Sequence, residues 1–341
     1  MGLQRLSDKP RILVVKLSSL GDLFHALPAV HVVKEGLGAA IDWVTQPEYA
    51  DLVRCFADVD HVRVFPRRTL LRDGRAFLRE LRRVEYEYAI DFQGLLKSAL
   101  VTRAARARKR IGPSYSREGA RWLYDCVAGR KDKNRHAVEE GLDVARFFGL
   151  AIGDPQFPIE FPVVSPGGQA PRVALVPCSR WEAKNWPPER FAEVARRLSV
   201  EKGVSIYVLG GASDRDACGA LADEVGGDVV NLCGKTSLVE MAGTLREMDL
   251  VITVDSGPMH VAAALGVPVL ALFGATDPTR TGPYGSRHRV VEPVGKTRDA
   301  RAFKTGDASL MEGISVEQVV EAALDMLAVQ EAKSPVRGRD E

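Results

Sequence analysis

Short apolar runs of strand length alternate with helical patterns along almost the whole chain, and few folds are open to a sequence of this kind. Arg11–Lys16, Ile41–Thr45 and Leu250–Val254 are typical of the apolar runs, whereas His136–Phe148 and Val316–Val329 are two of the helical patterns. Strands separated by helices are characteristic of a parallel sheet with helices on both faces. The sequence therefore predicts an α/β fold.

A proline-rich segment interrupts this alternation once. Ile152–Pro171 contains five prolines and three glycines, which a long helix would not accommodate. The alternation resumes directly after it. We therefore predict two Rossmann-like, doubly wound domains facing a cleft, the first over residues 1–160 and the second over residues 161–330, and a disordered charged tail over residues 331–341.

Composition excludes several classes of protein. An apolar fraction of 45% and a charged fraction of 27% are ordinary for a soluble globular protein. The five cysteines are scattered and form no C-x-x-C pair, which argues against a disulfide framework and a zinc site. Met1–Pro10 does not resemble a signal peptide, and no apolar run approaches the roughly 18 residues of a membrane span. We expect a cytoplasmic protein for which any membrane contact is peripheral.

The charge is unevenly distributed along the chain. Residues 63–135 contain 20 lysines and arginines against 8 acidic residues, although the whole chain carries a net charge of only +2. Such an excess suits an anionic partner. The simpler interpretation is that solvated helix faces carry these cations, and we favour it for most of the side chains.

The loop after the first predicted strand contains the first candidate site. Lys16–Asp22 reads K-L-S-S-L-G-D, in which Gly21 permits a sharp turn and Asp22 stands at the start of a helix. The ordinary interpretation of Asp22 is an N-cap worth about 1 kcal/mol, and the local pattern favours it. A carboxylate here can also act as a general base, a role worth roughly 10²–10⁴-fold in rate. The loop is not a phosphate-binding P-loop, because the Gly-Lys-Ser/Thr ending is missing.

Two loops of the second predicted domain also follow strands. Lys184 precedes a helix with Pro187 in its first turn, where a lysine can bind phosphate, although an isolated lysine is more often simply solvated. Asp255 and Ser256-Gly257 precede another helix, whose free N–H groups form an anion site. Alternatively, Asp255 caps the turn and His260 is a core histidine. The loop as a whole is more specific than either residue.

Two aspartate pairs have the D-x-D spacing of a metal motif. They are Asp58 with Asp60 and Asp214 with Asp216. Such pairs arise often by chance, and Asp214 stands at a predicted helix start, where capping is its default role. We therefore predict neither a metal site nor a cofactor.

Several segments recur together in one known family. The matching segments are K-x-S-S-L-G-D over 16–22, D-x-Q-G-L-x-K-S-A over Asp91–Ala99, Lys184–Pro187, Asp255–Gly257 with His260, and Thr276–Pro278. In this order they resemble the ADP-heptose:lipopolysaccharide heptosyltransferases over about residues 11–329. Within that family the chain is most similar to the heptosyltransferase I branch, which adds the first heptose to the inner core.

The resemblance implies a GT-B architecture and an inverting, metal-independent transfer of heptose from ADP-L-glycero-D-manno-heptose to the 3-deoxy-octulosonic acid region of the lipopolysaccharide inner core. It implies that Asp22 is the general base and that Lys184 stabilises the departing diphosphate. The implied donor contacts are Ser179, Lys184, Asp214, Asp255, Ser256, Gly257 and His260. The implied acceptor contacts are Ser19, Gly21, Arg67, Arg68, Gln93, Lys97, Arg117 and His136.

The resemblance also implies the partners of the protein. The acceptor of the family is lipid A carrying 3-deoxy-octulosonic acid, an anionic glycolipid that gives the basic first domain a purpose. We therefore expect peripheral contact with the cytoplasmic face of the inner membrane and no nucleic-acid partner. The chain departs from the family at Arg180–Ala183, which is one residue longer and less acidic, and at Asp214, which replaces a longer glutamate.

Three other interpretations are compatible with this architecture. Within the family, the chain could be a heptosyltransferase II or use a different sugar donor. A nucleotide-sugar 2-epimerase would release a free sugar and need no anionic acceptor, which the basic first domain disfavours. A non-catalytic sugar-nucleotide-binding protein is disfavoured by the intact set of Asp22, Lys184 and Asp255.

Overall fold

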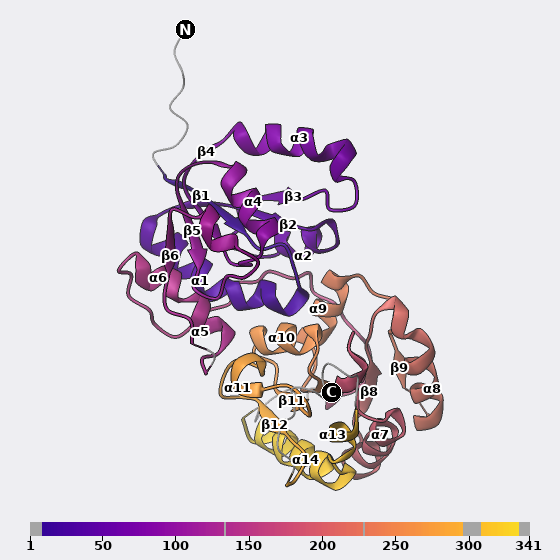
Figure 1. Cartoon of the computed structure of the whole chain (residues 1–341). Helices are drawn as coiled ribbons and strands as arrows, with labels where there is room; N and C mark the ends of the chain where they lie inside the picture. Colours follow the sequence, from indigo (N-terminus) through magenta and orange to yellow (C-terminus); the bar gives the residue numbers. More distant parts are fainter. Residues whose placement is uncertain (1–8, 133, 228, 296–307, 334–341) are drawn as a thin grey trace, which may run out of the picture. The chain divides into compact units, whose positions relative to one another are not determined.

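The computed structural model describes residues 9–132, 134–227, 229–295 and 308–333. The chain divides into two compact units, Met1–Glu160 and Phe161–Glu341, with the division inside the proline-rich segment (Figure 1).

The first unit contains a six-stranded parallel sheet. Its strands are β1 (Arg11–Val15), β2 (Ala40–Thr45), β3 (His61–Val64), β4 (Glu85–Asp91), β5 (Arg106–Pro113) and β6 (Cys126–Ala128). Its helices are α1 (Leu20–Leu37), α2 (Ala50–Arg54), α3 (Leu70–Arg82), α4 (Leu96–Ala104), α5 (Ala137–Gly141) and α6 (Asp143–Phe147), with 3₁₀ turns η1 (Pro47–Tyr49) and η2 (Ala120–Leu123).

The strand order of this sheet is β3-β2-β1-β4-β5-β6, which is the order of a Rossmann fold. The central strand β1 pairs with β2 and β4, and its residues Ile12 to Val15 are buried because helices cover both faces. On one face, Leu13 and Val15 pack with Leu81 of α3 and Val101 of α4. Helices α1, α5 and α6 pack together as a second group.

The second unit repeats the arrangement. Its strands are β7 (Arg172–Val176), β8 (Ser205–Val208), β9 (Val230–Asn231), β10 (Leu250–Val254), β11 (Val269–Leu272) and β12 (Arg289–Val291). Its helices are α7 (Pro188–Lys202), α8 (Arg215–Val225), α9 (Leu238–Arg246), α10 (Gly257–Ala264), α11 (Pro278–Thr281), α13 (Ser309–Glu312) and α14 (Val316–Lys333), with 3₁₀ turns η3 (Glu182–Lys184) and η4 (Ala212–Asp214).

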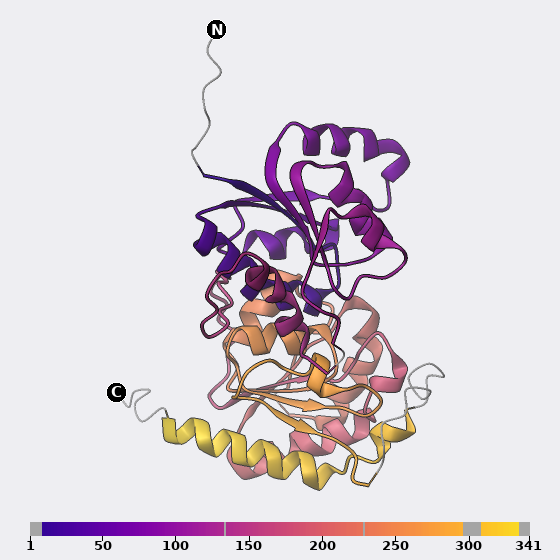
Figure 2. The ribbon, with the colours of Figure 1, turned by 60° about the vertical axis from the view of Figure 1, so that its left-hand side comes forward.

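The sheet of the second unit runs β12-β11-β10-β7-β8-β9, all parallel, which is the same Rossmann order read from the other edge. Helix α14, yellow in Figure 2, packs against α7 and against β10 to β12. Trp186 is fully buried in this core, and its indole N–H donates to the carbonyl of Ile314 at 3.1 Å. The predicted pair of doubly wound α/β units is therefore confirmed.

Some element boundaries differ from the sequence prediction. The helix predicted over His136–Phe148 is broken at Leu142 into α5 and α6. The edge strands β6 and β12 were not predicted. Helix α14 continues to Lys333, so the prediction of a disordered tail from residue 331 is wrong for residues 331–333. The rest of that predicted tail, residues 334–341, lies outside the described part of the chain.

In each unit the strand order reverses between two adjacent central strands. This happens between β1 and β4 in the first unit and between β7 and β10 in the second. In open α/β sheets, ligands bind beyond the carboxyl ends of the strands at such a reversal.

Among the described helices, none has the length and apolarity required to cross a membrane.

Candidate functional site

The loops after β1 and β4 are tied together at the reversal of the first sheet. The side-chain oxygen Oε1 of Gln93 accepts hydrogen bonds from the backbone N–H groups of Leu17 and Ser18, both at 3.1 Å. The ammonium of the buried Lys16 donates to the carbonyl of Phe92 at 2.9 Å. Gln93 therefore fixes the backbone just before Ser19, which makes it a support of this loop as well as a predicted acceptor contact.

Asp22 is the third residue of α1 rather than its N-cap, which is Ser19. Oδ2 of Asp22 accepts from the Ser19 backbone N–H at 3.0 Å and from the Ser19 hydroxyl at 2.7 Å. The carboxylate thus closes a capping box, so the predicted capping role is present one turn from the expected place. The side chain is still 43% exposed and accessible to a substrate.

The surroundings of Asp22 keep it ionised. Desolvation opposes ionisation, but the charges of Lys16 and His25 and the two hydrogen bonds from Ser19 outweigh it, so the pKa of Asp22 lies well below its ordinary value. Nδ1 of His25 lies 3.9 Å from Oδ1 of Asp22. Asp22 is therefore a carboxylate at neutral pH, which is the protonation state that a general base requires.

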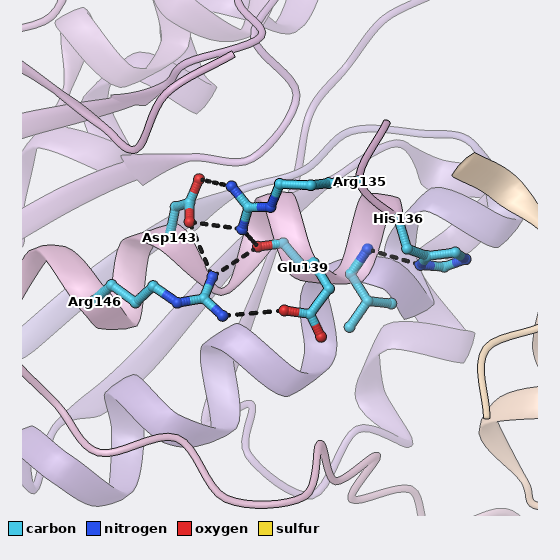
Figure 3. Close-up of polar contacts among 6 residues, drawn as sticks. Arg135, His136, Glu139, Asp143 and Arg146 are labelled. Carbon is cyan, nitrogen blue, oxygen red and sulfur yellow. Dashed lines mark hydrogen bonds and ion pairs between the residues drawn. The ribbon is translucent and has the colours of Figure 1, made fainter. Parts of the chain in front are cut away.

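His136 connects to this group through His25. The two imidazole rings meet edge to face with their centroids 5.4 Å apart. His136 is the N-cap of α5, and its Nδ1 accepts the backbone N–H of Val138 at 3.1 Å (Figure 3). Because Nδ1 is an acceptor, the proton of the neutral ring resides on Nε2.

An arginine network holds the segment before His136. Both terminal nitrogens of Arg135 donate to the carboxylate of the buried Asp143, each at 2.9 Å (Figure 3). Arg146 also bonds Asp143 at 2.9 Å and reaches Glu139 at 3.0 Å. The hydrogen bonds that Arg135 donates to Asp143 raise the pKa of Arg135. This bidentate geometry fixes the approach of the chain to His136.

The remaining predicted acceptor cations follow other strands of the first sheet. Arg67 and Arg68 follow β3 and are exposed, with Arg67 donating to the side-chain oxygen of Gln46 at 3.0 Å. Lys97 lies in the first turn of α4 and is exposed. The backbone N–H of Arg117, after β5, donates to the carbonyl of Gly94 at 2.8 Å.

The fully buried Asp91 organises the loop that contains Gln93. One oxygen of Asp91 accepts the N–H groups of Gln93 at 2.7 Å and Gly94 at 3.0 Å, and the other accepts the hydroxyl of Tyr124 at 2.8 Å. Burial raises the pKa of Asp91, and burial together with the Asp91 charge raises the pKa of Tyr124. Sequence reasoning missed the role of Tyr124, because nothing local relates it to Asp91, 33 residues away.

In the second unit, Lys184 and Asp255 are brought together at the sheet reversal. Nζ of Lys184 donates to Oδ2 of Asp255 at 2.6 Å, and the same oxygen accepts the hydroxyl of Thr276 at 2.7 Å. These residues come from the loops after β7, β10 and β11. The arrangement places a cation beside the start of α10, where the helix dipole also favours an anion.

The serines of this site have partners within the protein. The backbone N–H of Ser179 donates to Oδ1 of Asn185 at 2.7 Å, and its hydroxyl donates to the carbonyl of Trp181 at 2.9 Å. Ser256 is the N-cap of α10, and its hydroxyl lies 3.1 Å from that of Thr253. Ser256 therefore presents backbone rather than its hydroxyl at the helix start.

Gly257 and His260 belong to the first turns of α10. Gly257 is the first residue of the helix, and His260 is half-buried in its second turn. The N–H groups of Gly257 and Met259 are among those that a helix leaves without an intrahelical partner, whereas Pro258 between them has no N–H. They are the groups available to a phosphate at this helix start.

Asp214 caps a turn after β8. Its Oδ2 accepts the backbone N–H of Gly211 at 2.8 Å, and its Oδ1 accepts the hydroxyl of Ser213 at 3.0 Å.

The aspartates of the other D-x-D pair also have partners: Asp58 contacts His31 at 3.0 Å, and Asp60 contacts Lys34 at 3.2 Å. Within the described ranges, no group of three or more histidine, cysteine or acidic side chains is arranged to hold a metal ion.

The sequence profile of Glycosyltransferase family 9 (heptosyltransferase) matches residues 74–307. Lipopolysaccharide heptosyltransferase 1 of Pseudomonas aeruginosa is 34% identical over 298 residues, covering 81% of each chain. The protein of the same name from Escherichia coli K12 is 30% identical over 298 residues, covering 82% of this chain and 92% of that one.

The fold also matches a solved structure of a relative. The structure of E. coli heptosyltransferase WaaC with ADP superposes with a TM-score of 0.79 at 26% identity, covering 93% of this chain and 99% of the other. The similarity therefore extends over both units.

Proposed function

Since the chain belongs to glycosyltransferase family 9, the heptosyltransferases, and is thus a glycosyltransferase of lipopolysaccharide core synthesis, we propose that it transfers heptose from ADP-heptose to the 3-deoxy-octulosonic acid region of the inner core. One observation supports this most strongly. Each unit carries a charged group at its sheet reversal, an ionised carboxylate in the first and a lysine beside a helix start in the second. We assign the acceptor to residues 1–160 and the donor to residues 161–330.

The donor diphosphate is bound by Lys184 and by the start of α10. Lys184 donates to Asp255, and this carboxylate orients the charged ammonium, which attracts the phosphates of the donor. The backbone N–H groups after Ser256 supply further donors. Ser179, Asp214 and His260 complete the proposed donor contacts, with Asp214 exchanging its bond to Gly211 for the ribose. The structure of a relative with ADP supports this assignment.

The reaction is a single inverting displacement. The acceptor hydroxyl attacks the anomeric carbon of heptose while the bond from that carbon to the diphosphate oxygen breaks, and ADP departs with the bonding electrons. The hydroxyl proton goes to the carboxylate of Asp22. Because the pKa of Asp22 is low, it accepts this proton only as the attacking oxygen becomes acidic in the transition state. Ser19 and Gly21 position the acceptor beside it.

Lys184 and the α10 dipole stabilise the charge that grows on ADP, which is the task a divalent ion performs in other transferases. We therefore propose that transfer is independent of metal. Activity should persist in excess EDTA. Complete loss of activity that Mg²⁺ or Mn²⁺ restores would contradict this part of the proposal and return attention to the D-x-D pairs.

The acceptor is an anionic glycolipid, which places the reaction at the cytoplasmic face of the inner membrane, where the soluble donor meets it. Arg67, Arg68, Lys97 and Arg117 are the proposed contacts to its phosphates and carboxylates, with Gln93 and His136 beside the reacting sugar. We favour the heptosyltransferase I branch because relatives with that name match across four-fifths of the chain.

The test is incubation of the protein with ADP-heptose and a deacylated acceptor, followed by mass spectrometry of the products. The expected result is an acceptor heavier by one heptose. Release of a free or rearranged sugar with an unchanged acceptor would instead identify an epimerase or hydrolase. A product formed only from an acceptor that already carries one heptose would assign the chain to heptosyltransferase II.

A further inference from the structure

Large apolar side chains are exposed on three neighbouring elements of the first unit. They are Leu70, Leu71 and Leu78 on α3, Leu96 and Leu100 on α4, and Trp122 on η2. Leu71 is fully exposed, and Trp122 is 87% exposed. Isolated exposed leucines are ordinary on a protein surface, but a group of this size that includes a tryptophan is not. We call these six residues with the cations around them the leucine–arginine face.

The three elements form one continuous surface. Helix α4 packs against η2 and also contacts α3. The inward side chains Phe77 and Leu81 of α3 and Val101 of α4 belong to one hydrophobic cluster with β1, so both helices cover the same face of the sheet (Figure 1). The exposed side chains of α3 and α4 therefore point away from that sheet on a common side.

Cations surround these apolar side chains. Residues 67–83 contain seven arginines and two acidic residues. Both acidic side chains are paired, Asp73 with Arg72 at 2.9 Å and Glu80 with Arg83 at 2.6 Å. The neighbouring segments add Lys97, Arg103, Arg117 and Arg121, all exposed.

Helix α3 carries leucine and arginine on one outer stripe. Leu71, Arg75, Leu78 and Arg82 follow each other at intervals of four, three and four residues, so they lie along one side of the helix. All four are exposed. This stripe is opposite in character to the buried stripe that contains Phe77 and Leu81, and packing of the unit does not explain it.

The chemistry of this face fits a lipid surface. Leucine and tryptophan between arginines match the boundary of a bilayer, where apolar side chains reach the acyl region and guanidinium groups contact phosphates. An excess of arginine adds attraction to anionic headgroups. A protein partner would favour an apolar centre with charges at the rim, whereas here the two kinds of side chain alternate.

We propose that the leucine–arginine face docks the first unit on the surface of an anionic phospholipid bilayer. This inference rests on the proposed function, because a membrane-bound acceptor is the reason for docking. It deepens that function, since Arg68 precedes Leu70 by two residues and Lys97 follows Leu96. Proposed acceptor contacts thus lie at the bilayer surface, where they meet a headgroup that stays in its membrane.

The direct test is flotation of the full-length protein with vesicles that contain no lipid A. Vesicles of phosphatidylcholine with phosphatidylglycerol should bind the protein, and vesicles of phosphatidylcholine alone should bind it at least about tenfold more weakly, with binding reduced by salt. The double variant Leu71→Glu/Trp122→Glu should lose about tenfold or more in affinity for the anionic vesicles. The double variant Arg75→Glu/Arg79→Glu should also lose about tenfold or more in affinity for the anionic vesicles, because it replaces two positive charges with negative ones.

The matched control is Val200→Glu on α7 of the second unit, because Val200 is also 87% exposed. This variant should bind vesicles as the wild type does. Thermal melting of each variant checks that it is folded. Failure of the wild-type protein to bind anionic vesicles, or equal binding by Leu71→Glu/Trp122→Glu, would overturn the inference.

Transfer assays separate docking from the proposed function. Leu71→Glu/Trp122→Glu should keep wild-type kcat/KM with a water-soluble deacylated acceptor and lose about tenfold or more with acceptor embedded in anionic vesicles. A protein that binds vesicles through this face but transfers no heptose to either acceptor would refute the proposed function and leave the docking inference standing. If Leu71→Glu/Trp122→Glu is as active as the wild type on both acceptors, the docking inference is refuted and the proposed function stands.

Discussion

Lys184 and Asp255 form an ion pair at the strand reversal of the second sheet, with 2.6 Å between Nζ and Oδ2. Their side chains are only 16% and 7% exposed, and Thr276 donates to the same carboxylate oxygen. The two charges are thus paired where little water reaches them. A ligand that reaches Lys184 meets an ammonium that is already oriented, which lowers the entropic cost of binding.

A mutant cycle measures this pairing. Lys184→Met and Asp255→Asn should each lower the free energy of unfolding by about 1–3 kcal/mol, because each removes the attraction between two poorly hydrated charges. The double variant should cost less than the sum of the two. Urea denaturation gives all four values. Arg108→Met is the control, since Arg108 and Glu87 form an exposed pair, and it should change stability by at most about 0.5 kcal/mol. An additive cycle would show that the pair contributes no coupling.

Asp22→Asn tests the base. The asparagine side-chain oxygen can still accept from the N–H and hydroxyl of Ser19, so α1 should keep its cap. The melting temperature should fall at neutral pH, because the charge beside Lys16 and His25 is lost. The amide cannot take a proton, so kcat should fall by roughly 10²-fold or more, with donor affinity retained. Steady-state kinetics and calorimetric titration with ADP provide the readouts. Turnover close to that of the wild type would remove Asp22 from this role.

The pH dependence follows from the lowered pKa of Asp22. A base with a depressed pKa stays ionised as pH falls through the ordinary aspartate range, so the acidic limb of kcat/KM due to Asp22 should lie below that range. Ser19→Ala removes a hydrogen bond to the charged form, which raises the pKa and should move this limb to higher pH. Ser213→Ala, which removes a hydroxyl from Asp214 instead, should leave the profile in place. Superimposable profiles for Ser19→Ala and the wild type would contradict the prediction.

The same hydrogen bonds affect stability. Because the pKa of Asp22 is lower in the folded than in the unfolded chain, its ionisation contributes stability above the unfolded pKa, and this contribution is lost as pH falls through the folded pKa. Ser19→Ala should therefore reduce stability more at neutral pH than in strong acid. Denaturant melts at several pH values check this difference.

Gly94 is predicted to be indispensable in the loop of Gln93. Its φ is +70°, and a Cβ atom would lie 2.9 Å from Cγ of Pro113 and 3.1 Å from Cα of Ser116. Gly94→Ala should lower the free energy of unfolding by about 2–4 kcal/mol, from a left-handed backbone and a backbone clash together. Gly149 has the same φ with open space around it, so Gly149→Ala should cost only about 1–2 kcal/mol. Equal costs would show that the clash is relieved.

Much of the fold was predictable because its signal is repetitive. Strands such as β1 and β10 are buried on both faces and therefore consist of continuous apolar residues that the sequence displays directly. The edge strands β6 and β12 each have three residues and are partly exposed, so they carry no periodic signal. Leu142 keeps helical torsion angles close to the 3₁₀ type, so nothing in the local pattern marks the break between α5 and α6.

The sequence indicated which loops contain the candidate residues, but it did not indicate which side chains these residues contact. Following the strand ends located Asp22, Lys184 and Asp255 at the sheet reversals. Lys184 is 71 residues from Asp255 in the sequence, and Thr276 is 21 residues from it. These side chains meet only because the sheet places β7, β10 and β11 side by side. Such pairings arise from tertiary structure, and a single sequence does not encode them as a local pattern.

Each unit is one uninterrupted stretch of chain, and this has a consequence for synthesis on the ribosome. All six strands of the first sheet are translated before β7 begins, so the first unit can complete its core while the second is still being made. The second unit has no such advantage, because α14, the last described helix, packs against β10 and against α7, which lies in the early part of this unit's sequence. Its core closes only after α14 has been translated, so chains interrupted before α14 should contain a folded first unit and a second unit vulnerable to proteolysis.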